Sequence, residues 1–142
     1  MTFAELDAYT SKLAVALQGI GVSKGEFVGI LAPNCVEFEV GFFGILKAGA
    51  TVTTINSGYR EREIAAQLNA SGAPVLIVHD SLIEMAEAAA KDIPGLKRLI
   101  VISDSSDDPT SFWGIIDAAE GEPTAVDIDP INDLAALPFS SG

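Results

Sequence analysis

The sequence predicts an α/β domain with a doubly wound, mostly parallel sheet and helices on both faces. Four short apolar runs rich in β-branched residues lie at residues 27–32, 51–55, 75–79 and 99–103, and their starts are 24 residues apart. Because these runs lack polar alternation, they are typical of strands that are buried on both faces, as in a parallel sheet. Helical patterns separate the runs and supply the crossovers that parallel strands require.

The first helix is expected to begin after Thr2, because Thr2 and Glu5 have the spacing of a capping box. In that motif the hydroxyl and the carboxylate each satisfy a backbone N–H that the helix leaves without a partner. Residues 34–37 and 81–84 repeat the spacing with Asn and Ser as caps, so they are expected to start the second and fourth helices. The first helix carries one apolar stripe and is expected to end at residues 19–21, where glycine favours a helix terminus.

Apolar patterns and stop signals predict the remaining helices. The second helix, over residues 38–46, is apolar nearly all round, which predicts burial on two sides. A third helix is expected over residues 61–70, with Gly72 as its stop. A short helix is expected over residues 111–119, and a last apolar run follows at residues 134–139.

The composition is that of an acidic chain, and its length suffices for one domain. Of its 142 residues 49% are hydrophobic, and 20 acidic residues against 8 basic ones give a net charge of −12. That charge would repel a phosphate backbone or an anionic membrane surface, so nucleic acid is not an expected partner. The acids gather in loops at residues 104–111 and 120–133, which are expected to be solvated surface.

No membrane span is predicted. The most apolar stretch, residues 40–55, is interrupted by Lys47, by glycines and by threonines. The N-terminus lacks the basic and then apolar pattern of a secretory signal. A cytoplasmic location is therefore the default expectation.

Most single residues with reactive side chains predict no site. The glycines of residues 19–25 follow a helix and precede a strand, the reverse of a dinucleotide fingerprint. His79 has Asp80 beside it but no second ligand, and Cys35, the only cysteine, has apolar neighbours. The aspartates of residues 104–108 lack the glycine and distal glutamate of a calcium loop. We therefore predict no catalytic residue and no metal site within the chain.

The informative site is the end of the chain, where the last apolar run leads into Ser140, Ser141 and Gly142. A strand that feeds small hydroxylated residues and glycine is typical of phosphate binding. Backbone N–H groups can approach the ligand where glycine has no side chain, and hydroxyls add donors. These three residues are the predicted ligand-binding residues.

Ordered motifs along the whole chain resemble the adenylate-forming, or AMP-binding, superfamily. They are TFAEL at residues 2–6, GVSKGEFV at 21–28, LAPN at 31–34, GILKAGA at 44–50 and DLAALPFSSG at 133–142. The likeness is greatest to the acyl- and aryl-CoA ligase branch, which includes 4-coumarate-CoA ligases, fatty-acyl-CoA ligases and luciferases. The chain departs from the family pattern at Ser57, where proline is common, and at Arg60, where threonine is common.

The resemblance implies a parent enzyme that is an acid–thiol ligase of fatty acid or phenylpropanoid metabolism. Such an enzyme uses ATP with Mg²⁺ to turn a carboxylic acid into an acyl-adenylate and then transfers the acyl group to coenzyme A. Ser140, Ser141 and Gly142 would contact the ATP phosphates. The family's catalytic lysines, metal-binding glutamate and acyl pocket would all lie beyond residue 142.

On this resemblance, residues 1–142 are expected to be a partial N-terminal AMP-binding domain that ends within the phosphate loop. Such a fragment is expected to be inactive, to bind none of these ligands tightly, and to self-associate through faces that the parent covers. The alternative is a stand-alone flavodoxin-like binding or signalling module. That class needs an acidic cluster or a phosphate loop after the first strand, where this chain has Ala32, Pro33 and Asn34.

Overall fold

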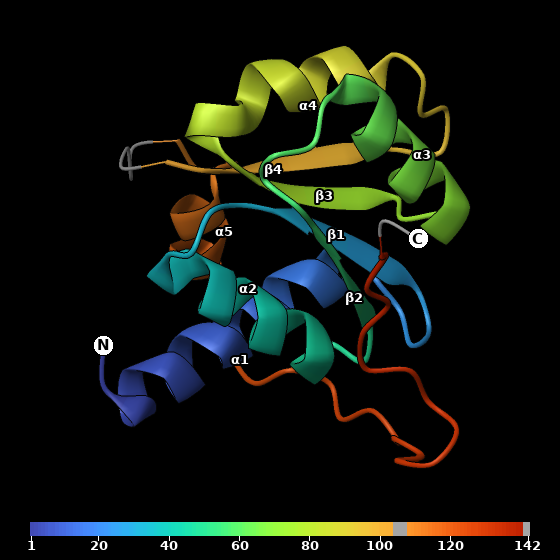
Figure 1. The fold of residues 1–142 in the computed structure, drawn as a ribbon. Coiled ribbons are helices and arrows are strands. Elements are labelled where there is room, and N and C mark those ends of the chain that lie inside the picture. Colours follow the sequence, from blue (N-terminus) through green and yellow to red (C-terminus); the bar gives the residue numbers. More distant parts are fainter. Residues whose placement is uncertain (104–107, 141–142) are drawn as a thin grey trace.

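A parallel sheet of four strands lies at the centre of the computed structural model, which describes residues 1–103 and 108–140 (Figure 1). The strands are β1 (Phe27–Leu31), β2 (Thr51–Ile55), β3 (Val75–His79) and β4 (Arg98–Ile102). Their order in the sheet is β2-β1-β3-β4, and every pair is parallel. The four predicted strands are confirmed, with differences of one residue at the ends of the first and the last.

Helices cover both faces of this sheet. On one face lie α1 (Phe3–Gly19), α2 (Val36–Lys47) and α5 (Phe112–Ala118), and on the other lie α3 (Glu61–Ser71) and α4 (Ile83–Ala90). The chain passes from β1 to β2 through α2 and then crosses back over β1 to β3 through α3. The predicted doubly wound α/β fold is confirmed.

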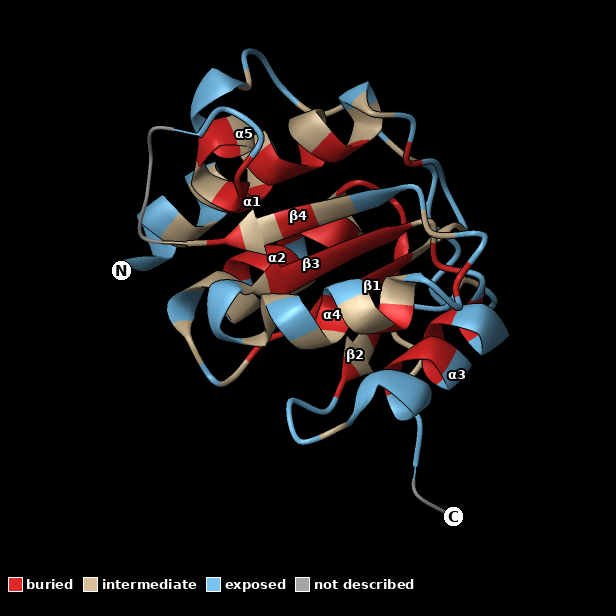
Figure 2. Ribbon diagram, turned by 90° about the horizontal axis from the view of Figure 1, so that it is seen from above, coloured by how far each residue is buried: buried red, intermediate tan, exposed pale blue. Residues whose placement is uncertain are grey.

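Two apolar cores, one on each face of the sheet, hold these layers together, and Figure 2 shows the buried strands between the helices. Val28 and Ile30 of β1 face the core that α1, α2 and α5 share, whereas Leu31 belongs to the core under α3 and α4. The helix α2 packs on the sheet and on α1, yet Val36 and Phe43 are 48% and 44% exposed. The predicted burial of α2 on two sides is therefore confirmed only for part of its surface.

The capping box at the start of α1 is confirmed. The backbone N–H of Thr2 donates to Glu5 Oε2 at 2.7 Å, and the N–H of Glu5 donates to Thr2 Oγ1 at 3.2 Å. The start of α3 keeps half of such a box, because the N–H of Arg60 donates to Glu63 Oε2 at 2.7 Å. The guanidinium of Arg60 carries only donors, so it cannot supply the other half.

The capping boxes expected at residues 34–37 and 81–84 are wrong. The helix α2 begins after Cys35, not after Asn34, so Glu37 is one residue too near the helix start to reach back. Before α4 the chain makes a 3₁₀ turn, Asp80–Leu82, whose first N–H groups include that of Ser81, bonded to His79 Nδ1 at 3.2 Å. The N-cap position of α4 is thereby Leu82, and the Ser81 hydroxyl lies 2.8 Å from His79 Nδ1 instead of capping the helix.

The stop of α3 is confirmed, because Gly72 adopts the left-handed conformation at φ 69°. Among the helices of residues 1–103 and 108–140, none has the length and apolar character to cross a bilayer.

Candidate functional site

The last described segment, residues 134–140, runs along the outer edge of β2 in the same direction as the strand (Figure 1). The backbone N–H of Val52 donates to the Ala135 carbonyl at 3.0 Å, and the N–H of Leu137 donates to the Val52 carbonyl at 2.8 Å. The segment forms a single bridge and not the full strand that its apolar run suggests. It delivers Ser140 toward the carboxyl ends of β1 and β2, the edge where parallel sheets bind ligands.

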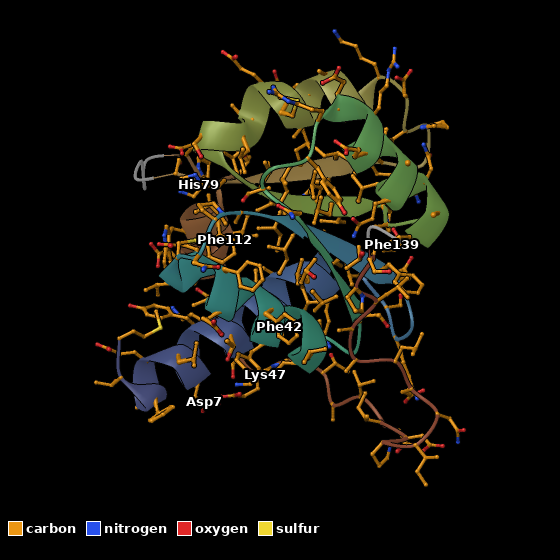
Figure 3. All side chains as sticks on the ribbon, in the orientation of Figure 1. Asp7, Phe42, Lys47, His79, Phe112 and Phe139 are labelled. Atoms are coloured by element: carbon orange, nitrogen blue, oxygen red, sulfur yellow. The ribbon has the colours of Figure 1, made fainter. Side chains whose placement is uncertain are left out.

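Two hollows lie beside Phe139 at this edge. The first, of about 490 Å³, is lined by the ends of β1 and β2, the loop after β2, and Phe139. The second, of about 500 Å³, lies between α3 and the pair Phe139 and Ser140. Figure 3 shows Phe139 next to α3. Tyr59 and Gln67 line both hollows, so the two form one continuous surface around the end of the segment.

The first hollow is lined mostly by polar groups without charge, whereas the lining of the second is mostly apolar. Asn56 and Ser57 line the first hollow, and Asn56 Oδ1 accepts the N–H of Gly58 at 2.8 Å, which holds the loop after β2 in a tight turn. Ser57, the first departure from the family pattern, thus lies in the lining of the site. Glu63 of α3 is the one acidic residue in the lining of the second hollow.

Of the three predicted site residues, Ser140 is described, and it is exposed in the lining of the second hollow. Ser141 and Gly142 lie outside the described residues. The ranges 1–103 and 108–140 contain no cluster of three or more His, Cys, Asp or Glu side chains that could hold a metal ion. The described residues do not fit Mg²⁺, and we derive no step through it.

The long connection from α5 to this edge is fastened to the body of the domain. Gln18 of α1 accepts the N–H of Thr124 at 2.8 Å and donates to its carbonyl at 3.0 Å. Lys24 donates to the Asp127 carbonyl at 2.6 Å and forms an ion pair of 2.7 Å with Asp133. The hydrogen bond from Lys24 lowers the pKa of Asp133, and the same bond raises the pKa of Lys24.

The attachment of this connection through aspartate side chains is expected to weaken in acid. The pKa of Asp129 is also lowered, chiefly by the Asn132 side chain. Since both aspartates titrate below the ordinary value in the folded chain, their contribution is complete above that value and is lost as the pH falls through the lowered values. We expect Lys24→Met to move the titration of Asp133 upward, as measured by carbon NMR of the carboxyl group. Lys12→Met, on α1, should leave it unchanged, and an identical titration in Lys24→Met would contradict the ion pair.

The other reactive side chains lie elsewhere and have local partners. His79 Nδ1 is 2.8 Å from Ser81 Oγ and 3.0 Å from Asp80 Oδ1, and Figure 3 shows His79 well apart from Phe139. Burial raises the pKa of the Cys35 thiol, which is the opposite of what an activated nucleophile needs. Asp104 and Asp107 lie outside the described residues. The prediction of no catalytic residue stays a prediction.

Two residues that hold the segment, Thr53 and Gln67, did not emerge from the sequence. Thr53 Oγ1 donates to the Leu137 carbonyl at 3.0 Å and accepts from Gln67 Nε2 at 2.9 Å. Both side chains are buried. The one signal available was a polar residue within each of two elements that also carry apolar residues, and many such residues have no role in a site.

The AMP-binding enzyme family matches the chain over residues 1–142. A 4-coumarate–CoA ligase from Pinus taeda is 34% identical over 142 residues, which cover 99% of this chain and 26% of that protein. The 4-coumarate–CoA ligase 2 of Oryza sativa subsp. japonica is 37% identical over 153 residues, covering 99% of this chain and 27% of that protein. The chain thus spans about a quarter of the length of these curated relatives.

Solved structures agree with these relatives. A long-chain-fatty-acid–CoA ligase from Archaeoglobus fulgidus matches with a TM-score of 0.90 and 30% identity, over all of this chain and 28% of that one. An anthranilate CoA ligase in complex with anthranoyl-AMP matches with a TM-score of 0.86 and 32% identity, over all of this chain and 27% of that one. A match of the whole chain does not favour a flavodoxin-like module. The chain belongs to the family of AMP-binding enzymes.

Proposed function

We propose that the whole protein is an ATP-dependent acid–CoA ligase and that this chain supplies the part of its N-terminal domain that leads into the ATP-phosphate loop. The observation that carries the proposal is the family match over the whole chain, together with the position of Ser140 at the carboxyl edge of a parallel sheet. The relatives named as 4-coumarate, fatty-acid and anthranilate CoA ligases support a carboxylic acid as substrate.

The proposed reaction has two steps. A carboxylate oxygen attacks the α-phosphorus of ATP, which forms the acyl-adenylate and releases pyrophosphate as the α–β phosphoanhydride bond breaks. The thiol sulfur of coenzyme A then attacks the acyl carbon, which forms a thioester and releases AMP, while the thiol proton passes to a base or to water. Catalysis of the first step consists mostly of positioning the reactants and stabilising charge on phosphate.

Within this reaction Ser140, Ser141 and Gly142 are proposed to receive the ATP phosphates through a hydroxyl and backbone N–H groups. The net charge of −12 offers no general attraction for a polyphosphate, so local donors have to supply the binding. Residues 1–142 are proposed to be inactive when isolated, because one end of a phosphate loop cannot orient two reactants. Self-association of the isolated chain stays a prediction; its support is the exposure of Phe3 (92%) and Val36 (48%), and sedimentation would measure it.

The test compares the full-length gene product with residues 1–142 in an ATP–pyrophosphate exchange assay, using a panel of aryl and fatty acids. We expect exchange with at least one acid for the full-length protein and none for the isolated chain. Absence of exchange and of thioester formation with every acid, from a folded full-length protein, would refute the ligase proposal. Exchange by residues 1–142 alone would refute the assignment of this part as incomplete. A cytoplasmic location stays a prediction that cell fractionation would check.

A further inference from the structure

The ladder between β2 and the segment of residues 134–140 ends after one bridge, at Val52. Alternate residues of a strand direct their backbone groups to the same edge, so the groups of Thr54 face the segment as those of Val52 do. A continued ladder would join Thr54 to the Leu137 carbonyl and to the N–H of Phe139. The structure fills these places differently.

Side-chain hydrogen bonds take the place of the next two backbone hydrogen bonds of the ladder. The Leu137 carbonyl accepts a hydrogen bond from Thr53 Oγ1 at 3.0 Å. The Thr54 carbonyl accepts one from Gln67 Nε2 at 2.9 Å, and the same amide nitrogen donates to Thr53 Oγ1 at 2.9 Å. Gln67 therefore closes the edge of β2 and also orients the hydroxyl that holds Leu137.

This hydrogen-bond network is buried, so its members need one another as partners. Thr53 is 0% exposed and Gln67 is 4% exposed, although both carry polar groups. A buried polar group that loses its hydrogen-bond partner destabilises the fold, so each member strongly favours the arrangement that satisfies the others.

We propose that Thr53 and Gln67 are positioning residues that set the point at which the chain leaves the sheet, and thereby the position of Ser140. This inference rests on the proposed function, in which Ser140 and the two residues after it receive the ATP phosphates. Neither residue needs to touch the nucleotide. Because the ladder ends at Leu137, Phe139 and Ser140 lie beside α3 and not along β2.

The test uses Thr53→Val and Gln67→Met in the full-length protein, since each keeps the side-chain volume roughly constant and removes the hydrogen-bonding group. We expect kcat/KM for ATP to fall about tenfold or more, with KM for the carboxylic acid within about twofold of wild type, because a small misplacement of a reacting group is costly. Thr53→Ser keeps the hydroxyl and should restore kcat/KM for ATP.

The matched control is Thr51→Val. Thr51 is also a buried threonine of β2, and its Oγ1 donates to the Leu134 carbonyl of the same segment at 2.8 Å. The backbone bonds of Val52 still hold the segment beyond that point, so kcat/KM for ATP should stay near wild type. Equal losses in Thr51→Val and Thr53→Val, or unchanged kinetics in both Thr53→Val and Gln67→Met, would overturn the proposal.

A second readout separates this inference from the proposed function. Amide hydrogen exchange of the peptide that contains residues 137–140 should accelerate in Thr53→Val and Gln67→Met, and not in Thr51→Val or Thr53→Ser. If the wild-type protein shows no adenylation, the ligase proposal fails, while the exchange pattern still tests whether these two residues position the segment. Unchanged exchange in Thr53→Val and Gln67→Met would refute that role.

Discussion

Replacing Gly114 with alanine is expected to destabilise the chain more than any other single methyl addition among its described glycines. A Cβ at this position would lie 2.1 Å from the Asp108 carbonyl oxygen and 2.8 Å from Pro109 Cα. Both are backbone atoms, so no rotamer change can relieve the clash. The loop before α5 is also held in place, because Ser111 Oγ donates to the Asp108 carbonyl at 2.7 Å and accepts the N–H of Gly114 at 3.1 Å.

The expected cost is about 3 kcal/mol or more, at the upper end of what overpacking a well-ordered site produces. Urea unfolding followed by the fluorescence of Trp113, the only tryptophan, measures it next to the altered residue. The indole ring lies edge-on to Tyr9 of α1, with centroids 5.2 Å apart, so release of α5 also changes the native signal.

Gly19→Ala is the matched control for Gly114→Ala. A Cβ at Gly19 would meet nothing within 4 Å, and Gly19 is the last residue of α1. Alanine there should be neutral or should raise the free energy of unfolding by about 0.5–1 kcal/mol, because it loses less backbone freedom than glycine. Equal unfolding midpoints for Gly114→Ala and Gly19→Ala would contradict the close approach of the Asp108 loop.

The sequence predicted the sheet well because each strand has a clear local pattern. Each is a short run of β-branched residues, such as residues 75–79, which can be buried on both faces in only one common arrangement. The helix starts were harder to predict. A capping box depends on register, and a shift of one residue, from Asn34 to Cys35, removes it. The turn that uses Ser81 depends on the ring nitrogen of His79, which no spacing rule includes.

The residues that hold the candidate site in place were harder to predict than the segment that carries it, and phosphate binding there stays a prediction. Small hydroxylated residues after an apolar run indicated phosphate binding at Ser140, and the structure places this residue in the lining of the hollow between α3 and Phe139. The support given by Gln67 could not be predicted, because it depends on where α3 crosses the edge of β2. A sequence also shows Gly114 only as a poor helix residue, since the loop that requires glycine there folds back from Asp108 in three dimensions.

Gly44 is a second position where glycine permits a close approach, here between the helices α1 and α2, and the obstacle is a side chain. A Cβ at Gly44 of α2 would lie 2.7 Å from Leu13 Cδ2 and 3.0 Å from Leu13 Cγ. Leu13 of α1 is fully buried, so it has little room to move away. We expect Gly44→Ala to cost about 1–3 kcal/mol through overpacking, and Leu13→Ala about 2–5 kcal/mol through the cavity that it leaves.

The double variant is expected to cost less than the sum of these two losses, by about 0.5–3 kcal/mol, because the new methyl group of residue 44 enters space that the leucine vacates. Urea unfolding of all four proteins measures this coupling. Leu13→Ala combined with Gly19→Ala should be additive, since a Cβ at Gly19 meets nothing. Additivity in the Gly44 cycle would show that the helices separate instead of clashing. At Gly114, by contrast, the obstacle is backbone, so no truncation of a neighbouring side chain should restore stability.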